Sequence, residues 1–188
     1  MSSETDWRMR ASRLPALFAN NAKTVGTLAM PTGRLVVAHG VATISTDDFV
    51  PFRRTTPIGE FPVEVTLAKS SSGEERIAAV RIIVSPLPIA EWEEAQGPEL
   101  AGTTGVMMDM QAAAAFQSFA DEHVEWWYDV KSTKSDGWQY GCFQPNEAEN
   151  VNVAFFSMGA YEGTYQSYWA LAGNGMPIML VTDFNVAP

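Results

Sequence analysis

The C-terminal quarter of the chain constrains the fold most, because it holds two strand-like runs joined by an Asn-Gly dipeptide. Residues 164–171 and 176–184 are rich in aromatic, β-branched and other apolar residues, a composition typical of strands. Asn174-Gly175 favours a tight hairpin turn, and Pro177 suits a strand start or an edge position. With a third apolar run at 151–157, the sequence predicts three consecutive strands.

Further strands are predicted upstream. Val63, Val65 and Leu67 alternate with polar residues, the period-two pattern of a half-buried strand. Residues 76–85 are apolar on both faces except at Arg81, which predicts a central strand. The runs 24–30 and 34–38 flank Pro31-Thr-Gly33 and are predicted to form a hairpin. Residues 39–60 are predicted to be loop, and 138–143 a short strand.

Helical signals are fewer. Asp109 can cap a helix over about 110–127, in which Phe116, Phe119, Ala120, His123 and Trp127 share one face. Pro15 interrupts residues 6–22, which predicts a short helix or two turns there. Residues 86–100 are predicted to contain a short helical turn at best.

These elements predict an α+β, mainly β fold: a twisted antiparallel sheet or sandwich with one principal helix (about 110–127) packed on a face. The chain has 188 residues, of which 46% are hydrophobic, enough for one domain with a substantial core. The predicted domain is 1–188, with an N-terminal helical segment at 1–23 and a β-rich core at 24–188.

The charge balance argues against several classes of partner. The sequence has 12 Lys and Arg against 22 Asp and Glu, a net charge of −10. A field of that sign repels nucleic acid and anionic membranes and attracts a basic protein. The lone Cys142 excludes an internal disulfide and Cys-rich zinc sites. The N-terminus is polar, and no apolar run reaches the roughly 18 residues needed to span a bilayer. We therefore expect a cytoplasmic protein.

Several short motifs occur in a fixed order between residues 28 and 184. The segment 157–170 contains Tyr161-Glu-Gly163, and Leu180-Val-Thr-Asp-Phe184 follows. Upstream lie Thr32-Gly-Arg-Leu-Val36, Pro57-Ile-Gly-Glu-Phe-Pro-Val63, Glu75-Arg-Ile-Ala78 and Trp92. In this order the chain resembles the bacterial domain-of-unknown-function family 4241, whose motif has Gly-Asp-Gly where this chain has Tyr161-Glu-Gly163. The resemblance implies a common fold but does not indicate any particular activity.

The candidate site is the loop from Ser157 to Tyr165. Glu162 and Asp183 are the acidic residues of this block and are candidate catalytic carboxylates. The competing interpretation makes Glu162 a turn residue and Asp183 a hydrogen-bond partner of the backbone. Tyr168 is expected to be the exposed ring of its strand. The full set of candidate ligand-binding residues is Ser157, Gly159, Glu162, Gly163, Tyr165, Tyr168 and Asp183.

No metal or cofactor is predicted. The two histidines, His39 and His123, form no metal-binding spacing, although His39 precedes Asp47 and Asp48. His123 is expected to be partly buried on the apolar face of its helix. Cys142 is expected to be a small core residue of a strand rather than a nucleophile.

Three functions follow as hypotheses. The first is a non-catalytic binding protein, such as an immunity or accessory protein, that captures a basic protein partner. The second is an enzyme or small-ligand-binding protein using Glu162 and Asp183, and the third is a structural component of a bacterial assembly. For the first hypothesis, the expected rim residues are Glu91, Glu93, Glu94, Tyr128 and Asp129.

Overall fold

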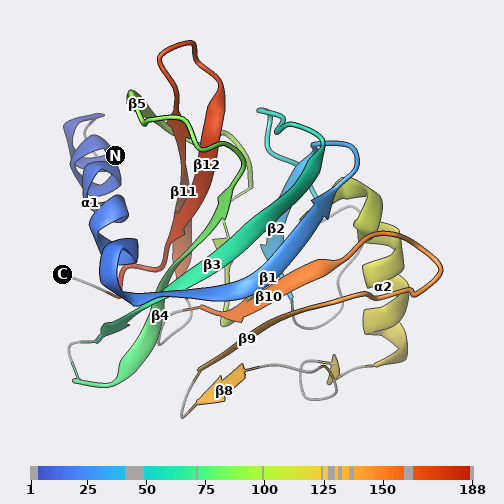
Figure 1. Cartoon of the computed structure of the whole chain (residues 1–188). Coiled ribbons are helices and arrows are strands. Elements are labelled where there is room, and N and C mark those ends of the chain that lie inside the picture. The colour runs from blue at the N-terminus through green and yellow to red at the C-terminus, as the bar shows by residue number, and fades with distance from the viewer. Residues whose placement is uncertain are drawn as a thin grey trace.

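The computed structural model describes residues 4–40, 49–70, 72–98, 100–123, 125–126, 130, 133–135, 138–158 and 163–186. Within these residues the chain forms two antiparallel sheets flanked by two α-helices (Figure 1). The mainly β fold with antiparallel sheets confirms the predicted class. The helices are α1 (Glu4–Asn21) and α2 (Ala113–Glu122), and a 3-10 turn at Met110–Ala112 precedes α2.

The first sheet has strands from both ends of the chain. Its order is β1 (Ala22–Met30), β3 (Gly59–Lys69), β4 (Glu75–Ile83), β12 (Pro177–Asp183), β11 (Thr164–Leu171) and β5 (Glu91–Glu94), and β6 (Leu100–Ala101) also pairs with β11. The second sheet has the order β2 (Leu35–His39), β7 (Thr104–Asp109), β10 (Val153–Ser157), β9 (Trp138–Phe143) and β8 (Thr133–Ser135).

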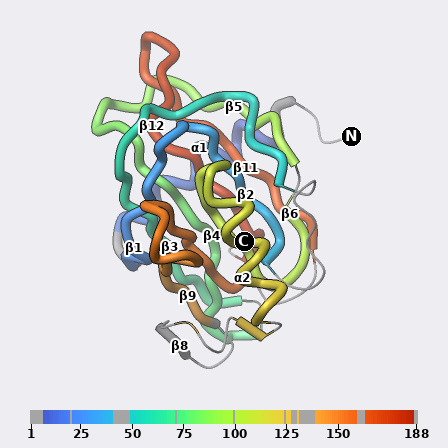
Figure 2. Tube along the Cα trace, turned by 90° about the vertical axis from the view of Figure 1, so that its right-hand side faces the viewer, coloured from blue at the N-terminus to red at the C-terminus, as the bar shows by residue number. Residues whose placement is uncertain are grey.

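Strand β10 of the second sheet is buried on both faces, which explains why its sequence lacks polar alternation. Along β10, Ala154 and Phe156 enter the core between the sheets, whereas Val153 and Phe155 pack toward α2. Successive side chains of a strand point to opposite faces, so a strand between two apolar layers reads as a continuous apolar run. The molecule is therefore layered as α1, first sheet, second sheet and α2, and Figure 2 shows α2 in front of the sheets with α1 behind them.

The predicted C-terminal strands and central strand are confirmed. The β11–β12 hairpin turns at Asn174-Gly175, where Gly175 has φ +77° and its N–H donates to the Ala172 carbonyl at 2.8 Å. The predicted central strand is β4, between β3 and β12. Its one charged interior residue, Arg81, pairs with Glu64 of β3 at 2.6 Å, which compensates for its half-buried position.

The predicted hairpin at Pro31-Thr-Gly33 is wrong. β1 pairs with β3 in the first sheet, whereas β2 pairs with β7 in the second. The turn therefore carries the chain from one sheet to the other. Tertiary partners decided this, because the stability of a strand depends on the neighbours against which its side chains pack more than on the turn that joins it to the next strand.

The N-terminal helix is longer than predicted and runs through Pro15. Proline removes one backbone hydrogen bond and costs about 3 kcal/mol in a helix interior. The helix nevertheless continues because Ala11, Leu14 and Phe18 are buried against the outer face of the first sheet. Packing of this kind supplies most helical stability in proteins.

Two other local predictions need correction. The predicted helix 110–127 is a 3-10 turn at 110–112 followed by α2, which ends at Glu122; Trp127 lies outside the described residues. The segment expected to hold a helical turn contains β5 instead, whose residues 91–94 pair with β11. The edge of β11 offers unpaired backbone groups, and pairing with them outweighs the weak local preference of Glu91-Trp-Glu-Glu94.

Candidate functional site

The predicted C-terminal site is dispersed over different surfaces of the sheets. Tyr165 points into the core between the sheets and packs edge-on against Phe184, with ring centroids 5.2 Å apart. Tyr168 and Asp183 lie on the opposite face of the first sheet, beneath α1. Ser157 belongs to the second sheet, where its Oγ accepts a hydrogen bond from the Gln139 N–H at 2.9 Å.

Other members of that predicted site are placed only in part. The Gly163 carbonyl accepts a hydrogen bond from the Gly102 N–H at 3.3 Å. Gly159 and Glu162 lie outside the described residues. The described side chains of the predicted site therefore do not face a common cavity.

Tyr168 is buried, contrary to the expectation of an exposed ring. Its exposed fraction is 1%, and the ring of Trp7 in α1 stacks on it with a centroid distance of 6.3 Å. Burial raises the pKa of the Tyr168 hydroxyl, and the nearby Asp183 carboxylate raises it further, while Arg10 hydrogen-bonds it. The ring was misplaced because the sequence did not show that α1 covers this face.

Asp183 behaves as a structural carboxylate at the end of the sheet. Its Oδ1 accepts a hydrogen bond from the Asn185 N–H at 2.8 Å, and Asn185 adopts φ 54°. Asn185 Oδ1 in turn accepts from Arg10 Nη1 at 2.9 Å. Burial raises the pKa of the Asp183 carboxyl, opposed in part by the Asn185 N–H and the charge of Arg10. This side chain ties the last strand to α1.

We expect the unfolding free energy of Asp183→Asn, relative to that of the wild type, to be higher at neutral pH than in acid. A carboxyl whose pKa is raised by folding contributes most below its unfolded pKa, and that contribution is lost as the pH rises through the folded value. Asparagine keeps an acceptor for the Asn185 N–H and does not ionise. Urea unfolding of both proteins between about pH 3 and pH 7 tests this. The difference in unfolding free energy should shift in favour of the variant as the pH rises, and a constant difference would contradict the assignment.

The remaining candidate groups serve the fold. Cys142 is half-buried in β9, and burial raises the pKa of its thiol to about 11, so it is a poor nucleophile at neutral pH. Within the described part of the chain, no group of three or more His, Cys, Asp and Glu side chains could hold a metal ion. Asp47 and Asp48 lie outside that part.

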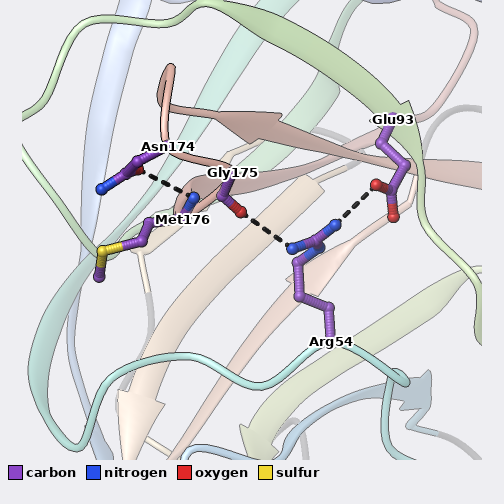
Figure 3. Close-up of polar contacts among 5 residues, drawn as sticks. All are labelled: Arg54, Glu93, Asn174, Gly175 and Met176. Carbon is purple, nitrogen blue, oxygen red and sulfur yellow. Dashed lines mark hydrogen bonds and ion pairs between the residues drawn. The ribbon is translucent and has the colours of Figure 1, made fainter.

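Of the expected rim residues, Glu93 forms an intramolecular ion pair with Arg54. Figure 3 shows Arg54 reaching both Glu93 of β5 and the β11–β12 turn. Arg54 Nη2 contacts Glu93 Oε2 at 2.6 Å, and Nη1 donates to the Gly175 carbonyl at 3.1 Å. Asn174 Oδ1 accepts from the Met176 N–H at 3.1 Å and tightens the same turn. Glu91 and Glu94 are exposed, while Tyr128 and Asp129 lie outside the described residues.

A groove lies elsewhere, between α2 and the loop that joins β9 to β10. Its volume is about 600 Å³, within the range of ligand-binding clefts. Figure 1 shows this loop beside α2. Apolar atoms come from Ala114, Ala115, Phe119 and Pro145, and the described polar lining comprises Ser118, Glu122, His123, Gln144, Asn146, Glu147 and Glu149.

The groove is acidic. Glu122, Glu147 and Glu149 line it, and none of its described lining residues is Lys or Arg. Glu122 lies in the last turn of α2, which contains no basic residue. A carboxylate at a helix C-terminus is disfavoured by the negative end of the helix dipole, by about 0.3–1 kcal/mol. The uncompensated negative charge makes this surface suited to a cation.

Local hydrogen bonds order the loop side of the groove. Asn146 Oδ1 accepts from the Ala148 N–H at 3.0 Å, and Asn146 Nδ2 donates to Glu149 Oε1 at 3.1 Å. The Glu149 N–H also donates to the Asn146 carbonyl at 3.1 Å. Asparagine commonly stabilises turns in this way. These bonds restrain Glu149 within the loop, where it lines the groove.

An aromatic pair lies on the α2 side of the groove. The ring of His123 packs on Phe119 at a centroid distance of 4.6 Å, and Phe119 packs on Phe143 at 5.1 Å. His123 is exposed, which corrects the expectation of a partly buried imidazole. His123 is the C-cap of α2. Because the helix ends there, His123 is not part of the apolar helix face on which its burial was expected.

No sequence motif identified this groove. The only local signals were the acidic residues at the end of the predicted helix and in the polar segment after residue 143. The predicted helix extended to residue 127 and therefore placed His123 in its interior, whereas α2 ends at Glu122. The proximity of α2 to the β9–β10 loop depends on how β9 and β10 pair in the second sheet, which no local pattern specifies.

A family described as a protein of unknown function, DUF4241, matches residues 28–100 of the chain. The resemblance inferred from the ordered motifs is thus confirmed over residues 28–100; for the C-terminal motifs it stays a prediction. Neither the curated proteins nor the solved structures gave a significant match. In the described residues, no helix is both long and apolar enough to cross a membrane.

Proposed function

We propose that this chain is a non-catalytic binding protein of the cytoplasm that captures a basic protein segment in the groove between α2 and the β9–β10 loop. The observation that carries the proposal is a groove of about 600 Å³ lined by three carboxylates, with no Lys or Arg among its described lining residues. Capture of a basic segment would suit a role as an immunity or accessory protein.

Electrostatics supports this assignment at two ranges. The net charge of −10 draws a basic partner toward the molecule and speeds encounter. At short range the three glutamates are the groups that a bound cation would meet, and the apolar lining residues can pack on the methylene chain of a long basic side chain. The short-range contacts specify where the cation binds, whereas the net charge does not.

Neutralising the groove should weaken capture of a basic peptide. The variant is Glu122→Gln, Glu147→Gln and Glu149→Gln, and the probe is a fluorescein-labelled peptide of alternating glycine and basic residues, both lysine and arginine. Exposed charge pairs contribute about 0.2–1 kcal/mol each, so three of them correspond to roughly a tenfold loss of affinity. Fluorescence anisotropy at low ionic strength, where screening is weak, measures the dissociation constant.

The matched control removes the same charge from other surfaces. Glu60, Glu75 and Glu91 are exposed and lie outside the groove lining, so replacing all three with glutamine gives the same net charge. The control should retain most of the affinity. Equal losses in the two triple variants would show that only the overall charge attracts the peptide, and no binding by the unmodified protein at low salt would refute capture itself.

A further inference from the structure

We infer that the groove selects arginine over lysine in its basic partner, an inference that rests on the proposed function. The distinguishing feature is the ring pair of Phe119 and His123 beside the three carboxylates of the groove. Both rings line the same cavity as Glu122, Glu147 and Glu149. The two features together fit a planar cation better than a spherical one.

The rings of Phe119 and His123 offer a surface on which a planar cation can stack. Phe119 is half-buried and packs on Phe143, and the exposed His123 packs on Phe119 at an interplanar angle of 37°. The ring pair therefore forms an aromatic surface in the lining of the groove. A guanidinium stacks on such a surface by both its π system and its charge. An ammonium attracts a ring face but cannot stack on it.

The carboxylates carry the second step. A guanidinium presents five N–H donors in a fixed fork that can meet two carboxylate oxygens at once, while an ammonium acts as a point charge. Glu149 is held by its contact with Asn146 in the loop, and Glu122 is the last residue of α2. Acceptors on two sides of the groove suit the spread donors of arginine.

The hydration of the two cations points the same way. An ammonium is strongly hydrated and loses more when it leaves water, whereas a guanidinium is weakly hydrated. The apolar groups that Ala114, Ala115 and Pro145 contribute to the lining cannot replace lost water. Entry into the groove therefore costs lysine more than arginine.

The test compares two labelled peptides that differ only in their basic residue, one with alternating glycine and arginine and one with alternating glycine and lysine. We expect the arginine peptide to bind roughly threefold to fivefold more tightly, the size of an exposed cation–π contact. Equal affinities would overturn the inference while leaving capture of basic segments intact. Failure of both peptides to bind would overturn the proposed function and this inference with it.

Two variants locate the preference. Phe119→Leu keeps an apolar side chain and removes the ring, and should bring the arginine peptide close to the affinity of the lysine peptide. Because Phe119 also packs on Phe143, His123→Gln at an exposed position is the second variant, and it should lower the arginine-to-lysine ratio with a smaller change in the urea midpoint than Phe119→Leu. An unchanged ratio in both variants would show that the rings play no part and would overturn the inference.

Discussion

Replacing Asp109 with alanine is expected to lower the unfolding free energy by roughly 3–5 kcal/mol, a large share of the stability of a typical domain. Asp109 has no exposed surface. Its Oδ2 accepts from the Thr32 N–H at 3.0 Å, and its Oδ1 accepts from Thr32 Oγ1 at 2.7 Å and from the Gln111 N–H at 2.9 Å. Alanine would remove all three hydrogen bonds at once and leave a gap where the fully buried carboxylate packs.

The effect should be large because Asp109 joins three parts of the molecule. It ends β7, caps the 3-10 turn before α2, and holds the 31–33 turn between β1 and β2. Its loss would loosen the groove helix as well as the connection between the sheets. Urea unfolding monitored by tryptophan fluorescence measures the change in free energy.

Asp109→Asn is the matched control for the size of the loss. Asparagine retains one oxygen acceptor but turns an NH₂ donor toward one of the donors that Asp109 now satisfies. The expected order of stability is wild type, then asparagine, then alanine. A loss below about 1 kcal/mol for alanine, the value of a typical single hydrogen bond, would contradict the role assigned to this carboxylate.

Gly33→Ala is the second change with a large expected effect. Gly33 has φ +68°, a conformation that costs a residue with a Cβ about 1–2 kcal/mol. An added Cβ would also collide with the backbone carbonyl of Thr56. That backbone cannot move freely, because the Thr56 N–H donates to the Gly33 carbonyl at 2.8 Å. Overpacking of this kind adds roughly 1–3 kcal/mol.

Gly73→Ala separates the two contributions. Gly73 has φ +85° in the β3–β4 turn, and a Cβ there would meet nothing within 4 Å. This control should show only the cost of the positive φ, about 1–2 kcal/mol. Gly33→Ala should exceed it by the cost of the collision when both variants are unfolded in urea. Equal losses would mean that the turn between the sheets can relax away from Thr56.

Sequence patterns identified the strands where local chemistry and packing agree. The β11–β12 hairpin follows from Asn174-Gly175, whose positive φ at Gly175 favours glycine. The central position of β4 follows from its apolar run, since only a strand with neighbours on both edges and layers on both faces excludes water so completely. The cap at Asp109 also followed from local chemistry.

Patterns failed where a partner distant in sequence decided the outcome. Tyr168 was predicted to be exposed because strand alternation assigns a residue to one of two faces without saying which face is covered. Trp7, more than 150 residues earlier in the chain, stacks on it. β5 was likewise not predicted, because it forms a strand by pairing with the edge of β11, which is distant in sequence. The acidic groove needs α2 and the β9–β10 loop side by side, which is a property of sheet pairing.

The sequence by itself determined the β-rich class, the C-terminal hairpin, the Asp109 cap and the acidic field, because each depends on residue type or on neighbours a few positions away. The tertiary structure alone decided which sheet β1 and β2 join, that α1 covers Tyr168, and that three glutamates line one groove. Period-two and 3.6-residue patterns specify which side chains share a face. The identity of the element that packs on that face depends on contacts between distant residues, whose free energy no local pattern records.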